Sequence, residues 1–404
     1  MASKRVCLAY SGGLDTSTIL VWLVKQGYEV VAFIADVGQE ENFSEVEKKA
    51  LSLGAERMVV ANLQQEFVDE LIFPAIQCNA IYEDRYLLGT SLARPVIARA
   101  QVKVAKQYNC TILSHGCTGK GNEYVQPSQR GSYLILTPFL LVKGRQALLN
   151  FAAENKIPVS STPKAPWSMD DNLAHCSYEA GILEQPELTP PENMWTRTVD
   201  PMKAPDEPTK FTVHFEKGVP VKLDIGDKVV TGSLEIFKAL NEIGRVHGVG
   251  RVDIVESRFI GLKSRGCYDT PGLTIARLAH VDLEGLVMDS KVRSLRDRFV
   301  SYEWSQCLYN GMYFSPEREF LQNSIEFSQR QVDGKVNMMA YKGNAYVLGR
   351  SSETSNLYSE TESSMDTLEG FSPMDTTGFI AIQGIRLEKY GARKIKDGEP
   401  LARV

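Results

Sequence analysis

The sequence predicts an α/β protein in which a doubly wound parallel sheet is followed by an α+β domain and a C-terminal helix. In the first hundred or so residues, short apolar runs alternate with amphipathic segments, as in a parallel sheet covered on both faces. After about residue 160, proline-rich connectors and hairpin patterns replace this alternation, and one more amphipathic segment follows them. We therefore expect domains at 1–160, 161–360 and 361–404.

Apolar spacing predicts the elements of the first domain. Arg5–Tyr10 is largely apolar, as in a strand buried on both faces. In Thr16–Gln26 the apolar residues recur at helical spacing, and Gly27 provides a stop. Ligands of such a sheet bind at the carboxyl ends of its strands, where Ser11 and Ser114 fall. The same reasoning predicts further strands at Glu29–Ala35, Arg57–Ala61 and Thr111–Ser114, and further helices at Glu41–Leu53, Phe67–Cys78 and Pro95–Gln107.

The second domain is predicted from two hairpins and a helix. Phe211–Leu223 is expected to turn at 216–218, Ser233–Val246 has helical spacing, and Lys335–Gly349 is predicted as a late hairpin. Residues 351–364 are polar and are predicted as a loop. Phe379–Tyr390 carries one apolar helical stripe, and this favours docking of the helix on a domain or on a neighbouring subunit.

Composition narrows the class of protein. The chain has 404 residues, 43% hydrophobic and 24% charged, the balance of a globular protein with a large core. Its net charge of −5 argues against a general nucleic-acid surface. No apolar run approaches the roughly 20 residues of a spanning helix, and the first residues do not form a signal peptide. The seven cysteines are scattered without a Cys-x-x-Cys pair. We therefore expect reduced thiols in a soluble, cytoplasmic protein.

A glycine pair lies at the junction of the first strand and helix, in Tyr-Ser-Gly-Gly-Leu-Asp-Thr-Ser from Tyr10 to Ser17. Gly12 and Gly13 allow backbone N–H groups to turn toward an anion, and the helix start adds unpaired donors. Asp15 would hold Mg²⁺ or cap the loop. A lone glycine pair is more often a simple turn, but this longer pattern is narrower, and the other two phosphate-loop patterns are absent. The loop is therefore predicted to hold the pyrophosphate of ATP, cut between the α and β phosphates.

A second glycine-rich stretch, Ser114–Asn122, follows another predicted strand. Its three glycines, its hydroxyls and Lys120 offer a further approach to phosphate or carboxylate, although such a stretch alone can be a simple flexible loop. His115 is expected to be structural, because no second histidine lies near it to share a metal.

The other polar stretches leave alternatives open. Residues 82–95 fit two interpretations equally well. They are either a turn that caps a helix beginning at Pro95, or a pocket for a zwitterion in which Thr90 and Ser91 face its carboxylate. Residues 251–258 alternate like a strand. The stretches expected to be solvated surface or loop are 167–170, 175–179 and 263–269.

Together these motifs resemble the argininosuccinate synthase family of the N-type ATP pyrophosphatase superfamily. The resemblance implies an ATP-dependent ligase that joins citrulline to aspartate through citrullyl-adenylate, with ATP bound as its Mg²⁺ complex. It also implies a homotetramer in which the C-terminal helix reaches across subunits. The matching stretches run in order along nearly the whole chain: AYSGGLDTS, YEDRYLLGTSLARP, SHGCTGKGN, PWSMD, SYEAGILE, HGVGR, DIVE, KSRG and MDTTGFI.

The resemblance also implies site residues, matched position by position. No nucleophile or metal ligand is singled out, because the implied chemistry is positioning and charge stabilisation. The ATP positions are Ala9, Tyr10, Ser11, Gly12, Gly13, Leu14, Asp15, Thr16, Ser17, Ala35, Ser114, His115, Gly116, Cys117, Thr118, Gly119, Lys120, Gly121 and Asn122. The citrulline positions are Tyr86, Ser91, Asn122, Ser168, Ser177, Glu256 and Tyr268, and the aspartate positions are Thr118, Asn122 and Glu123.

One segment, 123–142, departs from the family. It is shorter by roughly ten residues, a loss too large for ordinary loop variation. Glu123 replaces an aspartate, and Gln126 replaces an arginine whose charge-assisted contact glutamine cannot make. Losing such a contact weakens binding by about 1.5–3 kcal/mol. Either the enzyme has diverged here or the segment comes from an altered transcript.

Three hypotheses follow from the sequence. The first is the active ligase. The second is a catalytically impaired homologue that keeps the ATP loop and acts as an assembly subunit. The third, tRNA thiolation on the same ATP loop, would require paired cysteines and a basic face, and the sequence has neither.

Overall fold

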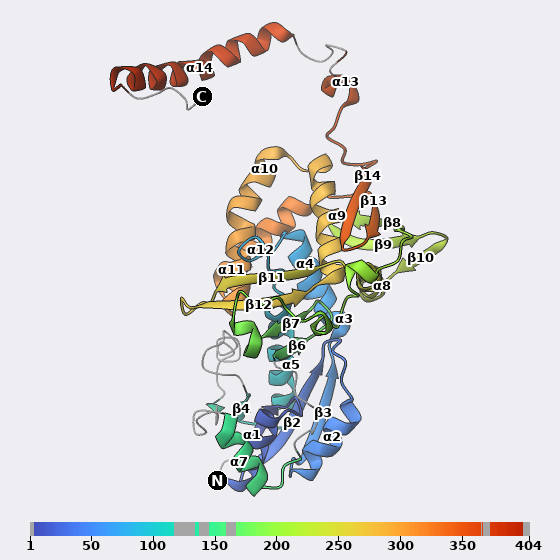
Figure 1. Cartoon of the computed structure of the whole chain (residues 1–404), viewed down its shortest axis with the longest axis vertical. Helices are drawn as coiled ribbons and strands as arrows, with labels where there is room; N and C mark the ends of the chain where they lie inside the picture. The colour runs from blue at the N-terminus through green and yellow to red at the C-terminus, as the bar shows by residue number, and fades with distance from the viewer. Residues whose placement is uncertain are drawn as a thin grey trace. The chain divides into compact units, whose positions relative to one another are not determined.

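The computed structural model describes residues 4–116, 134–136, 145–158, 167–364, 366 and 372–398. Contacts divide the chain into two units, Met1–Ser355 and Asn356–Val404. The first unit begins with a five-stranded parallel sheet, drawn in blue to green in Figure 1. In spatial order its strands are β3 (Arg57–Asn62), β2 (Glu29–Asp36), β1 (Arg5–Ala9), β4 (Ile112–Ser114) and β5 (Leu134–Leu136).

Helices cover both faces of this sheet, because alternate residues of each strand point to opposite layers. Val6 and Leu8 of β1 pack in one core with Leu20 of α1, whereas Cys7 packs in another core with Val96 of α5. The predicted doubly wound arrangement is therefore confirmed. The helices of this part are α1 (Leu14–Lys25), α2 (Phe43–Ser52), α5 (Gly89–Gln107) and α7 (Arg145–Glu154).

Two helix boundaries differ from the predictions. The helix predicted at Phe67–Cys78 begins earlier, and is made of α3 (Gln64–Phe67), a π-helical turn (Val68–Ile72) and α4 (Phe73–Gln77). The expectation that Pro95 opens a helix is wrong, because α5 begins at Gly89 and contains Pro95. Proline cannot donate to the carbonyl four residues before it, so the bond to Ser91 is missing from this helix.

Two antiparallel sheets follow. The predicted hairpins are confirmed in the five-stranded sheet β10 (Lys228–Thr231), β9 (Val219–Ile225), β8 (Thr209–Glu216), β13 (Gly334–Tyr341) and β14 (Asn344–Ser351). The four-stranded sheet is β11 (Arg251–Ser257), β12 (Lys263–Asp269), β7 (Cys176–Glu179) and β6 (Ser168–Asp171).

The four-stranded sheet corrects a prediction. Three of its strands contain stretches that were expected to be solvated surface or loop. Cys176, Tyr178 and Cys267 are fully buried and pack together in a small core. These strands were not recognised in the sequence because only every second side chain of each strand faces this core, and small polar residues lie between the apolar ones.

Helices pack around these sheets. Of the main helices here, only α8 was predicted, as Ser233–Val246. They are α8 (Ser233–His247), α9 (Pro271–Val287), α10 (Ser290–Leu295), a π-helical turn (Arg296–Val300), α11 (Ser301–Tyr309) and α12 (Pro316–Gln329). Short 3-10 turns lie at Gly181–Glu184, Glu192–Met194 and Pro201–Lys203.

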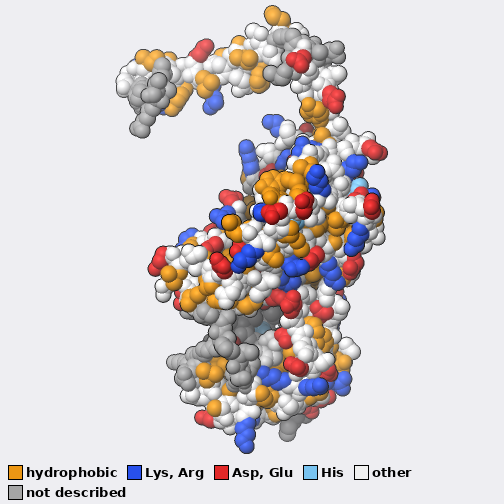
Figure 2. Space-filling view, turned by 45° about the vertical axis from the view of Figure 1, so that its right-hand side comes forward, with side chains coloured by type: hydrophobic (Ala, Val, Ile, Leu, Met, Phe, Trp, Pro, Cys, Tyr) orange, Lys and Arg blue, Asp and Glu red, His pale blue; other side chains and the backbone are white. Residues whose placement is uncertain are grey.

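The second unit contains a short helix, α13 (Glu360–Ser363), inside the stretch predicted as a loop, and a long helix, α14 (Pro373–Lys396). α14 extends beyond the predicted 379–390 at both ends. Its apolar side chains lie along the helix surface in Figure 2, and Phe379 and Ile382 are 64% and 68% exposed. Among the described residues, no helix is both long and apolar enough to cross a membrane.

Candidate functional site

The loop after β1 is held by bonds among its own groups and by a lysine of α2. The Ser11 N–H donates to Thr16 Oγ1 at 3.3 Å, and the Ser17 hydroxyl donates to the Gly12 carbonyl at 3.4 Å. Gly12 has φ +75°, a left-handed conformation that favours glycine. Lys49 Nζ donates to the same Gly12 carbonyl at 2.7 Å. The loop therefore has a fixed shape at the N-terminus of α1, where unpaired N–H groups and the helix dipole attract an anion.

A cleft of about 400 Å³ opens beside this loop. Ala9, Tyr10, Ser11 and Ala35, four of the positions matched to the ATP site, line it. Apolar side chains in its lining provide a surface for a flat ring: Phe33, Ile34, Val37, Ile97 and Met169. Carboxylates in its lining provide hydrogen-bond acceptors: Glu40, Glu41, Asp170 and Asp171.

The charges in this cleft would orient a nucleotide. The carboxylates repel phosphate, whereas the N–H groups of the loop and helix attract it. A triphosphate is therefore favoured along 11–17, and the carboxylates are left to accept hydrogen bonds from ribose or base. Asp15 lies exposed in the first turn of α1, and the N-cap residue Gly13 accepts the Thr16 hydroxyl at its carbonyl, at 3.4 Å. Among the described residues, no hydrogen bond joins Asp15 to the loop, so capping, one of the two roles predicted for Asp15, is not observed there.

The second predicted loop begins at the same edge of the sheet. Ser114 ends β4 in register with Leu8 of the neighbouring β1. A Cβ on Gly116 would lie 3.0 Å from the Thr16 methyl, so the two loops approach closely there. His115 is buried, as expected for a structural histidine. The remaining matched positions, Cys117, Thr118, Gly119, Lys120, Gly121, Asn122 and Glu123, lie outside the described residues.

Three residues matched to citrulline contacts meet in one cluster. Tyr86 and Tyr268 stack with ring centroids 4.0 Å apart. Tyr268 Oη donates to Glu256 Oε2 at 3.0 Å. Glu256 is only 6% exposed, and burial raises its pKa above the usual range, although hydrogen bonds from two tyrosines lower it. The cluster thus combines aromatic faces with a buried carboxylate, a suitable environment for an ammonium group.

The matched serines lie on β7, on β6 and in α5. Ser177 pairs with Tyr268 across β7 and β12, and its hydroxyl donates to the Asp170 carbonyl at 3.4 Å. Ser168 lies on the adjacent strand β6 and is exposed. Ser91 is buried in the first turn of α5, where Pro95 leaves its carbonyl without the usual helical donor. Tyr86, which lies in 82–95, belongs to the cluster, and this favours the interpretation of 82–95 as part of a pocket for a zwitterion.

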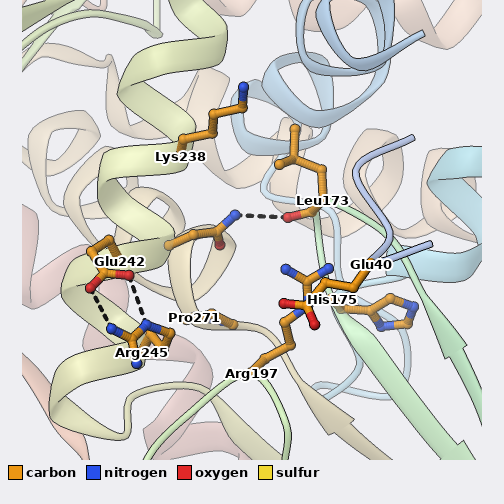
Figure 3. A pocket seen from close by; sticks show the side chains of 9 residues that line it. Glu40, Leu173, His175, Arg197, Lys238, Glu242, Arg245 and Pro271 are labelled. Atoms are coloured by element: carbon orange, nitrogen blue, oxygen red, sulfur yellow. Dashed lines mark hydrogen bonds and ion pairs between the residues drawn. The ribbon is translucent and has the colours of Figure 1, made fainter. Parts of the chain in front are cut away.

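Figure 3 shows a second pocket, of about 290 Å³, between α8 and the turn before β7. It shares Glu40 with the nucleotide cleft. Arg197, which lines it, donates to Asp171 at 2.7 Å and to the Gly38 carbonyl at 3.0 Å. Asn241 of α8 donates to the Leu173 carbonyl at 2.8 Å. The bond from Arg197 to Asp171 thus links a residue that lines this pocket to one that lines the cleft.

Asp269, which follows Tyr268, should make stability depend on pH. It is fully buried, its Oδ2 accepts the N–H groups of Arg197 and Thr198, and burial raises its pKa from 3.8 to about 6. The folded state therefore holds the proton more tightly, and the stability this adds is complete below about pH 3.8 and lost as pH rises through about 6.

The test is Asp269→Asn, whose amide oxygen can accept the same two N–H groups at every pH. Between pH 4 and 7, the wild type should lose about 2 kcal/mol of unfolding free energy relative to this variant. Denaturant titrations at each pH measure the difference. A difference that stays constant across this range would contradict the assignment.

Comparisons with known proteins identify the family. The "Arginosuccinate synthase N-terminal HUP domain" matches residues 5–158, and the "Arginosuccinate synthase C-terminal domain" matches 167–390. The chain belongs to the argininosuccinate synthase family. It is 54% identical to argininosuccinate synthase of Saccharomyces cerevisiae, over 99% of this chain and all of that one. Identity is 53% to the enzyme of Schizosaccharomyces pombe and 48% to that of Homo sapiens, each over at least 95% of both chains.

The alignment with the yeast argininosuccinate synthase extends over 418 positions, more than the 404 residues of this chain. Because all of the yeast protein is covered, this chain lacks positions that its relative has. The alignment length does not place these positions, so the shortening expected at 123–142, a segment that lies mostly outside the described residues, stays a prediction.

The site of this argininosuccinate synthase family member also contains residues that the sequence did not single out. Tyr309 Oη donates to Glu256 Oε1 at 2.9 Å, and Tyr82 stacks on Tyr309 with centroids 3.8 Å apart. His175 stacks over Tyr268, and burial lowers its pKa to about 3, so it is uncharged at neutral pH. Tyr82 and His175 lay in the stretches 82–95 and 175–179, which were named from the sequence without a role for these two residues, whereas Tyr309 reaches the cluster only through tertiary packing.

Proposed function

We propose that this chain is an active argininosuccinate synthase. It joins citrulline to aspartate at the expense of ATP, releasing AMP and pyrophosphate, and serves arginine biosynthesis or the urea cycle in the cytoplasm. The observation that carries the proposal is the identity of 54% over essentially the full length of a synthase.

In the first half-reaction, the ureido oxygen of citrulline forms a bond to the α-phosphorus of ATP. The bond from that phosphorus to the bridging oxygen breaks, and pyrophosphate leaves with the electron pair. The matched ATP positions 9–17, Ala35 and 114–122 would hold the nucleotide. The loop N–H groups and the α1 dipole stabilise the charge that accumulates on the departing pyrophosphate.

In the second half-reaction, the aspartate amine attacks the ureido carbon, loses a proton, and AMP leaves. Glu256 would receive the citrulline ammonium group beside Tyr86 and Tyr268, and Ser91, Ser168, Ser177 and Asn122 would contact the rest of citrulline. Thr118, Asn122 and Glu123 would bind aspartate. The catalytic contribution is positioning two substrates and stabilising charge.

Mg²⁺ would enter with ATP. Among the described residues no cluster of three or more acidic, histidine or cysteine side chains could hold a metal ion alone. Magnesium bound through phosphates and one carboxylate fits this arrangement, and Asp15 is exposed beside the phosphate loop. A homotetramer is part of the proposal, since the exposed apolar stripe of α14 offers a surface for a neighbouring subunit.

Pyrophosphate release from ATP tests the activity. We expect release that requires citrulline, and argininosuccinate once aspartate is added. An assembly subunit is the competing function, motivated by Gln126. It predicts intact tetramers that bind ATP but release no pyrophosphate with citrulline, and that result would overturn the ligase. Restoring charge with Gln126→Arg provides a matched variant, which should lower the KM of the substrates about tenfold if that segment limits binding.

A further inference from the structure

Glu256 is a buried carboxylate held by two neutral donors. One oxygen accepts the Tyr268 hydroxyl and the other accepts the Tyr309 hydroxyl, at 3.0 and 2.9 Å. None of the ion pairs found among the described residues includes Glu256, and it is only 6% exposed. An ionised carboxylate has about four acceptor sites, so each oxygen still has one for a further donor. Burial of such a charge is costly unless a cation completes it.

Tyr309 reaches this carboxylate from a separate element, as the last residue of α11. Its ring stacks on Tyr82 at an angle of 6°. Tyr82 in turn donates from Oη to the Ser257 carbonyl at 2.6 Å, and Glu83 accepts the Ser257 N–H at 3.2 Å. The backbone next to Glu256 and the ring that carries the Tyr309 hydroxyl are thus fixed by one segment.

We propose that Tyr309 is a positioning residue for this reaction: its hydroxyl orients the Glu256 carboxylate to receive the ammonium group of the amino-acid substrate. This inference rests on the proposed function, in which Glu256 contacts citrulline. Tyr268 alone would leave the carboxylate free to rotate about its own bonds. With both hydroxyls bonded, the plane of the carboxylate and its two remaining acceptor sites are fixed before the substrate binds.

The charged groups around Glu256 determine how a change at Tyr309 acts. Burial raises the pKa of Glu256; the hydroxyls of Tyr309 and Tyr268 lower it, Glu179 of β7 raises it, and Arg258, beyond β11, lowers it. Arg258 is itself paired with Glu179 at 2.5 Å. Tyr82 and Tyr86 complete the surroundings from the segment before α5, and both are uncharged, since burial raises their pKa. Removing the Tyr309 hydroxyl therefore raises the pKa of Glu256 further.

The test is Tyr309→Phe in the full-length protein, which keeps the ring and its stack on Tyr82. We expect the KM for citrulline to rise about tenfold, the loss of one hydrogen bond to a charged group. The kcat and the KM values for ATP and aspartate should stay within about twofold. As pH falls, Glu256 gains a proton and citrulline KM rises; in the variant this rise should begin at higher pH.

Tyr178→Phe is the matched control. Tyr178 is also fully buried, and its hydroxyl accepts the Thr196 N–H at 2.7 Å. The control should lower the melting temperature at least as much as Tyr309→Phe, with no shift in citrulline KM or its pH profile. An unchanged citrulline KM in Tyr309→Phe, or equal shifts in both variants, would overturn the positioning role.

If Tyr309→Phe does not fold, Tyr82→Leu provides a second variant: it removes the face on which Tyr309 stacks, and the Tyr82 hydroxyl bond to Ser257, but leaves the Tyr309 hydroxyl. It should raise citrulline KM in the same direction, and an unchanged KM would overturn the role. Wild-type protein that releases no pyrophosphate with citrulline would overturn the proposed function together with this inference. An active wild type with an unaffected variant overturns only the inference.

Discussion

Gly12→Ala should weaken ATP binding about a hundredfold and reduce citrulline-dependent pyrophosphate release with it. Gly12 has φ +75°, and an added Cβ would lie 3.2 and 3.3 Å from the two methyl groups of Val46. The left-handed conformation costs a non-glycine residue about 1–2 kcal/mol, and the contact adds about as much. The loop can relieve both only by moving the Gly12 carbonyl away from Lys49 and Ser17. A nucleotide titration and the pyrophosphate assay measure the two effects.

Gly27 provides the matched control at the other end of α1. Its φ is +79°, and nothing lies within 4 Å of where its Cβ would be. Gly27→Ala therefore introduces the same backbone strain without a contact and away from the cleft. It should lower stability by about 1–2 kcal/mol and leave ATP affinity unchanged. Equal ATP affinity in Gly12→Ala and wild type would exclude contact between this loop and the nucleotide.

The glycine loop after β1 could be predicted from sequence because most of the contacts that shape it are local. Strand, glycine pair and helix start lie within about a dozen residues, and hydrogen bonds join Ser11, Gly12, Thr16 and Ser17 to one another. The bond from Lys49 to the Gly12 carbonyl comes from farther along the chain. The parallel sheet was predictable for a related reason, since apolar runs such as Arg5–Tyr10 reflect burial on both faces. A local sequence pattern was enough to predict a structure wherever the residues that contact one another are also close in sequence.

The amino-acid site could not be predicted in this way. Tyr86, Glu256 and Tyr268 were named through the family resemblance, and they meet from the segment before α5, from β11 and from β12. Tyr309 joins them from a helix whose spacing was not recognised, and its role depends on a hydroxyl 2.9 Å from a residue 53 positions away. The helix start at Gly89 was missed because Pro95 is normally a first-turn residue. Tertiary packing outweighed that preference.

A buried ion pair joins α4, α9 and α12 to the turn before α11, the helix that carries Tyr309. Arg296 makes a bidentate contact with Glu284 of α9 and donates to the Gln77 carbonyl of α4 at 2.8 Å. Gln329 of α12 donates to the same carboxylate at 3.0 Å. Burial would raise the pKa of Glu284, but His280, Arg296 and Gln329 outweigh it and hold that pKa below the usual range. The region before α11, and hence the position of Tyr309, depends on this pair.

Arg296→Met should therefore destabilise the first unit by about 3–5 kcal/mol, because it leaves the Glu284 charge buried without its partner. Arg296 is 2% exposed and Glu284 fully buried. Arg245→Met is the control: Arg245 makes the same bidentate contact with Glu242, at 2.6 and 2.7 Å, but both side chains are about half exposed. An exposed pair contributes about 0–1 kcal/mol. Denaturant unfolding of the two variants measures the difference, and equal losses would show that burial of the pair does not set its contribution.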